Sequence, residues 1–136
     1  MATFVKFQDF IEAVGLGQHN LNTDTLKAYL SNATPDAAAD ADKADLAEIS
    51  NENGYTAPID IENSWSETGG TGTLTAVDKT ITASGGTVGP FRYAVIFNDD
   101  HDTDGLVCYW DYGSSITLQI GESFDLDFGA SVFTLG

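Results

Sequence analysis

Residues 100–105 carry the most specific chemical signal in the sequence. They read DHDTDG, which is the D-x-D-x-D-G spacing of a calcium-binding loop. Alternate carboxylates in such a loop converge on one hard cation, and the glycine permits the sharp turn. The twelfth position, where a calcium loop closes on its last carboxylate, is also acidic. The pattern predicts a calcium site made by Asp100, Asp102, Asp104 and Asp111.

A simpler interpretation of this loop stays open. The segments on either side are expected to be strands, whereas a calcium loop of this kind joins two helices. The closing ligand is Asp111 where the longer, bidentate glutamate is usual. Clusters of Asp, Asn and Gly between strands are also typical of exposed hairpin turns. The alternative is a solvated acidic turn that holds no metal.

Arg92 is the only arginine of the chain and stands among apolar residues. We expect a structural ion pair between Arg92 and a carboxylate such as Asp111 near the strand end. The alternative is an interface anchor, because arginine and aromatic side chains dominate the energetics of protein interfaces.

The sequence offers no recognisable catalytic constellation, so we expect no enzymatic activity. Catalysis by a nucleophile needs a neighbouring base, and acid–base catalysis needs carboxylates paired in a pocket. His19 and His101 lie in predicted loops without a serine or cysteine motif beside them. Cys108, the single cysteine, lies inside a predicted strand, has no basic neighbour in sequence to lower its pKa and is expected to be a buried thiol. Calcium is the one possible cofactor that the sequence indicates.

The elements that must position these residues are short strands. Runs of alternating or continuous apolar residues, separated by turn residues, are the signature of antiparallel sheet. The densest of them are expected to form a meander of four strands, at residues 91–97, 106–112, 115–120 and 123–128. Further strands are expected at residues 24–30, 59–62, 74–77 and 80–83, the last two meeting at Asp78 and Lys79.

Seven or eight short strands with a turn signal about every ten residues predict one domain with an all-β fold. We expect an antiparallel β-sandwich, jelly-roll-like, over residues 23–136. A mobile acidic loop is expected at 31–45, because this Ala/Asp-rich run lacks a hydrophobic stripe. A single helical turn at 45–49 is expected to lead to a left-handed cap at Asn53 and Gly54.

Residues 1–22 are expected to form an N-terminal arm or short helix followed by a loop. Phe7, Phe10, Ile11 and Val14 recur at helical spacing, whereas Phe4 could equally begin an extended arm. Two interpretations remain open, an arm that orders on contact with a neighbour and a helix that packs on its own sandwich.

The charge balance restricts the partners. With 21 acidic and 5 basic residues, the net charge is -16. Phosphate backbones are bound by Lys and Arg, so we expect neither nucleic acid nor an anionic membrane as a partner. The first residues lack the apolar run of a secretory signal and no segment approaches transmembrane length, so we expect a soluble protein. A single cysteine allows no intrachain disulfide, which suits folding in a reducing cytoplasm.

Several segments resemble small structural proteins encoded in tailed-phage head gene clusters. The resemblance is carried by GPFRYAVIFND at 89–99, WDYGSSITL at 110–118 and GESF at 121–124, with MATF at 1–4 and DTLK at 24–27. It covers both ends of the chain, while residues 31–88 match loosely. The loop at 100–105 departs from the pattern, so calcium would be a property of this chain alone.

Some of these proteins resemble the cement, or decoration, proteins on the outside of capsids, which have a jelly-roll-like β-sandwich. The resemblance implies a non-enzymatic virion protein, made in the host cytoplasm, that binds the major capsid protein in many copies as a dimer or trimer. The candidate interface residues are Phe4, Phe7, Phe10, Ile11 and Arg92. Two alternatives are a tail, neck or fibre-associated component and a calcium-dependent carbohydrate-binding adhesion module.

Overall fold

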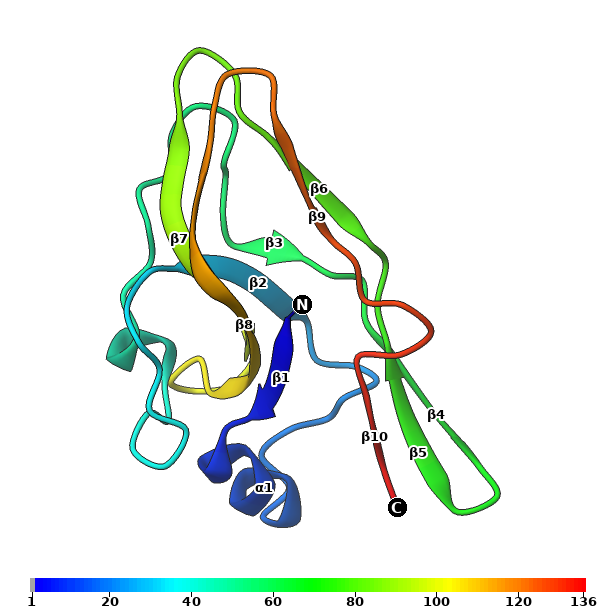
Figure 1. Ribbon diagram of the computed structural model, residues 1–136. Coiled ribbons are helices and arrows are strands. Elements are labelled where there is room, and N and C mark those ends of the chain that lie inside the picture. The colour runs from blue at the N-terminus through cyan, green and yellow to red at the C-terminus, as the bar shows by residue number, and fades with distance from the viewer. Residues whose placement is uncertain (1) are drawn as a thin grey trace.

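The computed structural model describes residues 2–136, and strands dominate this part of the chain (Figure 1). One α-helix, α1 (Gln8–Gly15), and one short 3-10 turn, η1 (Lys43–Asp45), interrupt them. The strands are β1 (Thr3–Lys6), β2 (Leu26–Ser31), β3 (Ile59–Asp60), β4 (Ser64–Thr68), β5 (Thr71–Thr75), β6 (Lys79–Thr82), β7 (Val88–Asn98), β8 (Leu106–Leu118), β9 (Ser123–Leu126) and β10 (Phe133–Leu135). No helix among these residues is long and apolar enough to cross a membrane.

Three antiparallel sheets make up the fold. The main sheet has the order β1-β8-β7-β2-β3, and the two smaller sheets are β10-β5-β4 and β6-β9. The smaller sheets lie across from the main sheet, so the fold is all-β and sandwich-like, as predicted (Figure 1). The layer opposite the main sheet is divided between two sheets, because β5 and β6 separate after residue 75.

The predicted meander is correct for its first half only. β7 and β8 form the central hairpin, with Ile96 opposite Cys108 and Ala94 opposite Trp110. β8 continues through Gly113 as one strand, where two strands were expected. β9 pairs with β6 instead of β8. The two strands expected to meet at Asp78 and Lys79 belong to different sheets, because β5 pairs with β4 and β10 while β6 pairs with β9.

One face of the main sheet meets the smaller sheets in the core. Leu26, Ala28 and Leu30 lie on it, and all three are fully buried. Across the strands, Leu30 lies opposite Ala94, Ala94 opposite Trp110, and Trp110 packs on Phe128 beyond β9 at 5.7 Å between ring centroids. Burial of apolar surface on this face is the main force that holds the layers together.

The other face of the main sheet is covered by the segment 32–49. The hydroxyl of Tyr29 donates a hydrogen bond to the Leu46 carbonyl at 3.0 Å. The Lys43 ammonium lies over the rings of Tyr29 and Phe97, 4.7 and 5.5 Å from their centroids. The central strands are therefore buried on both faces, which explains why β7 reads as an almost continuous apolar run.

The acidic segment 31–45 is a structured cover, and the prediction of a mobile loop is not supported. The amide of Gln8 donates to the Ala37 carbonyl at 2.9 Å, and the amide of Leu106 donates to the Ala41 carbonyl at 2.8 Å. Asp42 also forms a β-bridge with Gly105. These bonds come from distant parts of the chain, so local composition could not reveal them.

The N-terminal segment packs on its own sandwich, the second of the two interpretations. β1 is the edge strand beside β8, with Phe4 opposite Trp110. α1 follows, and Phe7 and Phe10 are 0% exposed. Assigning Phe7 and Phe10 to a partner interface was therefore wrong, because both rings belong to the core. Phe4 is half-buried against Trp110, whereas Ile11 is 53% exposed.

Candidate functional site

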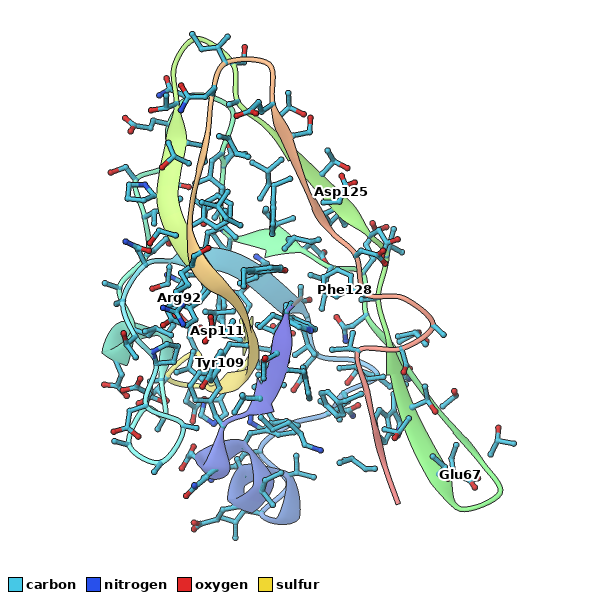
Figure 2. The ribbon with its side chains drawn as sticks, in the orientation of Figure 1. Glu67, Arg92, Tyr109, Asp111, Asp125 and Phe128 are labelled. Carbon is cyan, nitrogen blue, oxygen red and sulfur yellow. The ribbon has the colours of Figure 1, made fainter. Side chains whose placement is uncertain are left out.

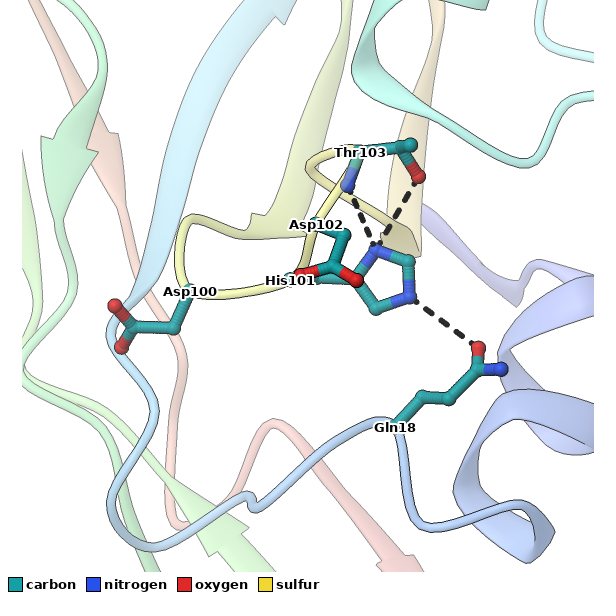
Figure 3. A pocket seen from close by; sticks show the side chains of 5 residues that line it. All are labelled: Gln18, Asp100, His101, Asp102 and Thr103. Atoms are coloured by element: carbon teal, nitrogen blue, oxygen red, sulfur yellow. Dashed lines mark hydrogen bonds between the residues drawn. The ribbon is translucent and has the colours of Figure 1, made fainter.

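A pocket of about 450 Å³ opens where the loop between β7 and β8 meets the segment that follows α1 (Figure 3). Both segments emerge at the same end of the main sheet, because Leu26 at the start of β2 pairs with Asn98 at the end of β7. Four of the lining residues come from the loop and one from the segment after the helix. They are Asp100, His101, Asp102 and Thr103, with Gln18.

Asn98, the last residue of β7, leads into the loop that lines the pocket and is fully buried. Its side-chain oxygen accepts a hydrogen bond from the amide of Asp100 at 2.9 Å, which fixes the orientation of the side chain. Its Nδ2 group then donates to the Asp24 carboxylate at 2.7 Å and to Nδ1 of His19 at 2.9 Å. A buried amide with these partners stabilises the site, whereas an unpaired one would be costly.

The two histidines of the chain stack on each other above Asn98. The imidazoles of His19 and His101 lie 5.0 Å apart between centroids, at 18° between planes. Nδ1 of His101 accepts hydrogen bonds from the amides of Gly105 and Thr103, at 3.2 and 3.3 Å. Its Nε2–H then donates to Oε1 of Gln18 at 3.3 Å (Figure 3). In this arrangement Nδ1 is the acceptor in both rings.

The pKa of His19 is lowered from its ordinary value of 6.5. Burial is the largest cause, because desolvation disfavours the imidazolium, and the neighbouring His101 adds to it. The carboxylates of Asp24 and Asp9 oppose the shift without cancelling it. The surroundings of His19 therefore favour its uncharged form at neutral pH.

We predict that the free energy of unfolding falls as the pH drops below 6.5. The unfolded chain takes up a proton on His19 near that pH, while the folded chain resists it, so stability rises with pH across this window and is complete above 6.5. Ordinary aspartates titrate near 4, well below this range. Denaturant unfolding between pH 7.5 and 5.5 measures the effect, and NMR titration of the imidazoles assigns it.

The control for this prediction is His19→Gln, which keeps a polar neutral side chain but cannot titrate. The variant should show a flatter dependence of unfolding free energy on pH between 7.5 and 5.5 than the natural chain. An NMR pKa for His19 at or above 6.5 would contradict the prediction.

The four carboxylates of the predicted calcium site are not brought together. Asp100 accepts a hydrogen bond from the amide of Thr25 at 2.7 Å. Asp111 lies inside β8, opposite Tyr93, and a strand advances about 3.3 Å per residue, so it is roughly 16 Å beyond Leu106. Within residues 2–136, no three carboxylate, imidazole or thiol groups are arranged to hold a metal ion.

The ion pair predicted between Arg92 and Asp111 is confirmed (Figure 2). Nε of Arg92 donates to Oδ1 of Asp111 at 2.8 Å, and its terminal NH2 donates to Oδ2 at 3.2 Å. The guanidinium, followed by the amide of Gly113, lowers the pKa of the Asp111 carboxyl. Since the Asp111 carboxylate is engaged by this fork, Asp111 has a structural partner in place of a metal.

Cys108 is fully buried in β8, as predicted, and burial raises the pKa of its thiol. The Thr103 hydroxyl lies 3.4 Å from Nδ1 of His101, but it donates to the Asp42 carboxylate at 2.6 Å, and Nδ1 already accepts hydrogen bonds from two amides. The contacts of this site hold the loop between β7 and β8 against the segment that follows α1.

No protein-family model, curated protein or solved structure matches the chain. The resemblance of the sequence to phage structural proteins therefore stays a prediction.

The histidine pair is the part of this site that sequence reasoning missed. His19 and His101 were correctly expected in loops, but nothing in their spacing indicates that the rings meet. The signal that could have found them is the pairing of β2 with β7, because it places both loops at one end of the sheet.

Proposed function

We propose that the chain is a non-enzymatic virion structural protein that decorates a tailed-phage capsid from the outside by binding the major capsid protein. The sequence resemblance supports this assignment, and so does the small sandwich-like fold. A net charge of -16 keeps such a protein soluble and away from the packaged DNA. Many copies acting together need only bind weakly one by one.

The observation that carries the proposal is the apolar surface of α1. Ile11 is 53% exposed and Leu16, at the helix end, is 64% exposed. The same helix is anchored from its other side by Phe10 and Ala13, which are buried. Because the helix is already folded, it can present apolar side chains to a partner without the free-energy cost of folding on binding. We assign the contact with the capsid protein to this helix surface.

The experiment is to add the purified protein to capsids that lack it and to image the particles. Density at regular shell positions is the expected result, and it also gives the number of copies at each position. Density only at the portal vertex or tail would overturn the capsid assignment in favour of a tail or neck protein. Absence of bound protein would overturn both.

A matched set of variants tests the helix surface. Ile11→Asp and Leu16→Asp are expected to weaken shell binding while the fold stays intact. Val77→Asp and Ile120→Asp are the controls, because these residues are similarly exposed, at 50% and 68%, but lie elsewhere on the molecule. Equal losses in all four variants would contradict the assignment to α1.

A further inference from the structure

The strand β4 has a free edge. It is the last strand of the small sheet β10-β5-β4, and the hairpin of β4 and β5 extends away from the main sheet with β4 on its outer side (Figure 1). Among residues 2–136, β5 is the only strand that pairs with β4. An exposed strand edge is a template for another strand.

The turn of the hairpin determines which backbone groups face outward. Gly69 and Gly70 both have positive φ, 59° and 88°, between the paired residues Thr68 and Thr71. In a two-residue hairpin of this kind, the residues that flank the turn exchange hydrogen bonds, and bonding then alternates along the strand. Trp65 and Glu67 therefore direct their N–H and C=O groups away from β5.

This edge lacks the usual protection against pairing. Natural edges carry Lys, Pro or a bulge, and β4 has none of the three. Its one charged residue is Glu67, near the tip of the hairpin (Figure 2), and the carboxylate accepts a hydrogen bond from the amide of Gly70 at 2.6 Å. The charge is therefore held at the turn of its own hairpin.

We propose that β4 pairs antiparallel with β4 of a second copy, about a two-fold axis at Ser66. In this register Trp65 of one copy lies opposite Glu67 of the other, and both residues have outward backbone groups. Each of the two pairs exchanges both of its backbone hydrogen bonds. The two Glu67 carboxylates are not directly opposite each other, so this register avoids the like-charge pair that would destabilise the dimer most.

The side chains of β4 fit the same arrangement. Ser64, Ser66 and Thr68 alternate with Trp65, which packs inward on Phe133 at 6.5 Å between centroids. The register places Ser66 opposite Ser66 of the second copy and Ser64 opposite Thr68, and hydroxyl pairs of this kind stabilise adjacent strands. The product is one sheet in the order β10-β5-β4-β4-β5-β10.

The inference deepens the proposed function, because it names the surface by which copies on a shell would join, but its test needs no capsid. Sedimentation velocity over a concentration series is expected to show a monomer–dimer equilibrium. Since each copy carries a net charge of -16, added salt should strengthen the dimer. A chain that stays monomeric at every concentration and salt level would overturn the inference.

Two variants of Glu67 locate the interface. Glu67→Pro removes an outward N–H that the dimer uses twice, and proline is tolerated where an edge N–H faces solvent. Glu67→Ala removes the same carboxylate and its bond to Gly70 but keeps the N–H. Dimerisation should be lost in the first and kept in the second; equal dimerisation of the two would overturn the assignment to β4.

A charge pair tests the register. Ser66→Lys places two like charges face to face across the axis and is expected to weaken the dimer about fivefold. Thr73→Lys is the matched control, because Thr73 lies opposite Ser66 on the same face of the sheet, one strand farther from the edge. Mixing Ser66→Lys with Ser66→Glu should restore pairing as a mixed dimer. If the mixture forms no more dimer than either variant alone, the register is overturned.

The outcomes separate this inference from the proposed function. A monomer that still decorates capsids overturns only the β4 dimer. A dimer through β4 that binds no particle supports the dimer and overturns the capsid role.

Discussion

Replacing Phe10 with alanine is expected to lower the free energy of unfolding by about 3–5 kcal/mol. The ring is fully buried and lies 5.6 Å from Phe133 and 5.2 Å from His19, between centroids. Alanine leaves a cavity between α1, β10 and the histidine pair. The loss in unfolding free energy is the sum of the transfer free energy of the removed ring and the cost of that cavity. Denaturant unfolding followed by tryptophan fluorescence measures it.

The control is Ile11→Ala on the same helix. Ile11 is 53% exposed, so its truncation should change the unfolding free energy by less than about 1 kcal/mol. Because a loss of 3–5 kcal/mol can unfold a small domain, Phe10→Leu serves as a milder second variant and should cost about 1–1.5 kcal/mol.

This comparison decides between the two interpretations of the N-terminal segment. If the segment is an arm that orders on a partner, Phe10→Ala leaves the isolated chain as stable as Ile11→Ala does and removes capsid binding. If α1 belongs to the core, Phe10→Ala destabilises the isolated chain by several kcal/mol more than Ile11→Ala. The burial of Phe7 and Phe10 leads us to expect the second result.

The strands that the sequence predicted best are those whose signal is local. β7 and β8 are dense apolar runs bounded by turn residues, and β9 alternates between buried Leu126 and exposed Asp125. β1 and β10 were missed as strands, although β1 is as long as β9. Each is defined by its partner, β8 for the first and β5 for the second, which no local window contains.

The features of the site likewise divide into one that the sequence could predict and others that depend on how distant segments meet. The pairing of Arg92 with Asp111 could be predicted because one arginine in an acidic chain has to find a carboxylate, and the two residues lie on adjacent strands of one hairpin. The four carboxylates expected to bind calcium are not gathered, and the reason is geometric: β8 is a strand and carries Asp111 away from the loop, whereas a helix would bring it back. The stacking of His19 on His101 depends on a pairing across the sheet and left no trace in sequence spacing.

Gly54 is the position where a single methyl group should have the largest effect on a loop. The prediction of a left-handed turn at Asn53 and Gly54 is confirmed, with φ of 56° and 96°. The turn closes by a hydrogen bond from the amide of Tyr55 to the Glu52 carbonyl. The helical turn predicted at 45–49 is wrong, because the 3-10 turn η1 spans Lys43–Asp45 and residues 46–49 are not helical. What the sequence could not show is that Gly54 also packs on the backbone of β6.

Gly54→Ala is expected to lower the free energy of unfolding by about 2–5 kcal/mol. A left-handed residue with a Cβ costs about 1–2 kcal/mol. The Cβ would also lie well inside the van der Waals radius of the Thr82 carbonyl oxygen, a backbone atom that cannot rotate away. Moving the loop off β6 adds about 1–3 kcal/mol and strains the hydrogen bond from Ser84 to the Asn53 carbonyl.

Gly85→Ala isolates the contribution of the close approach. Gly85 has a positive φ of 79° and open space where its Cβ would lie, so it carries the conformational cost alone, about 1–2 kcal/mol. The difference in unfolding free energy between the two variants therefore measures the contact between the Gly54 turn and β6. Equal losses would mean that the turn moves away freely, and the loop at residues 50–58 would then contribute little to holding β6 in the sandwich.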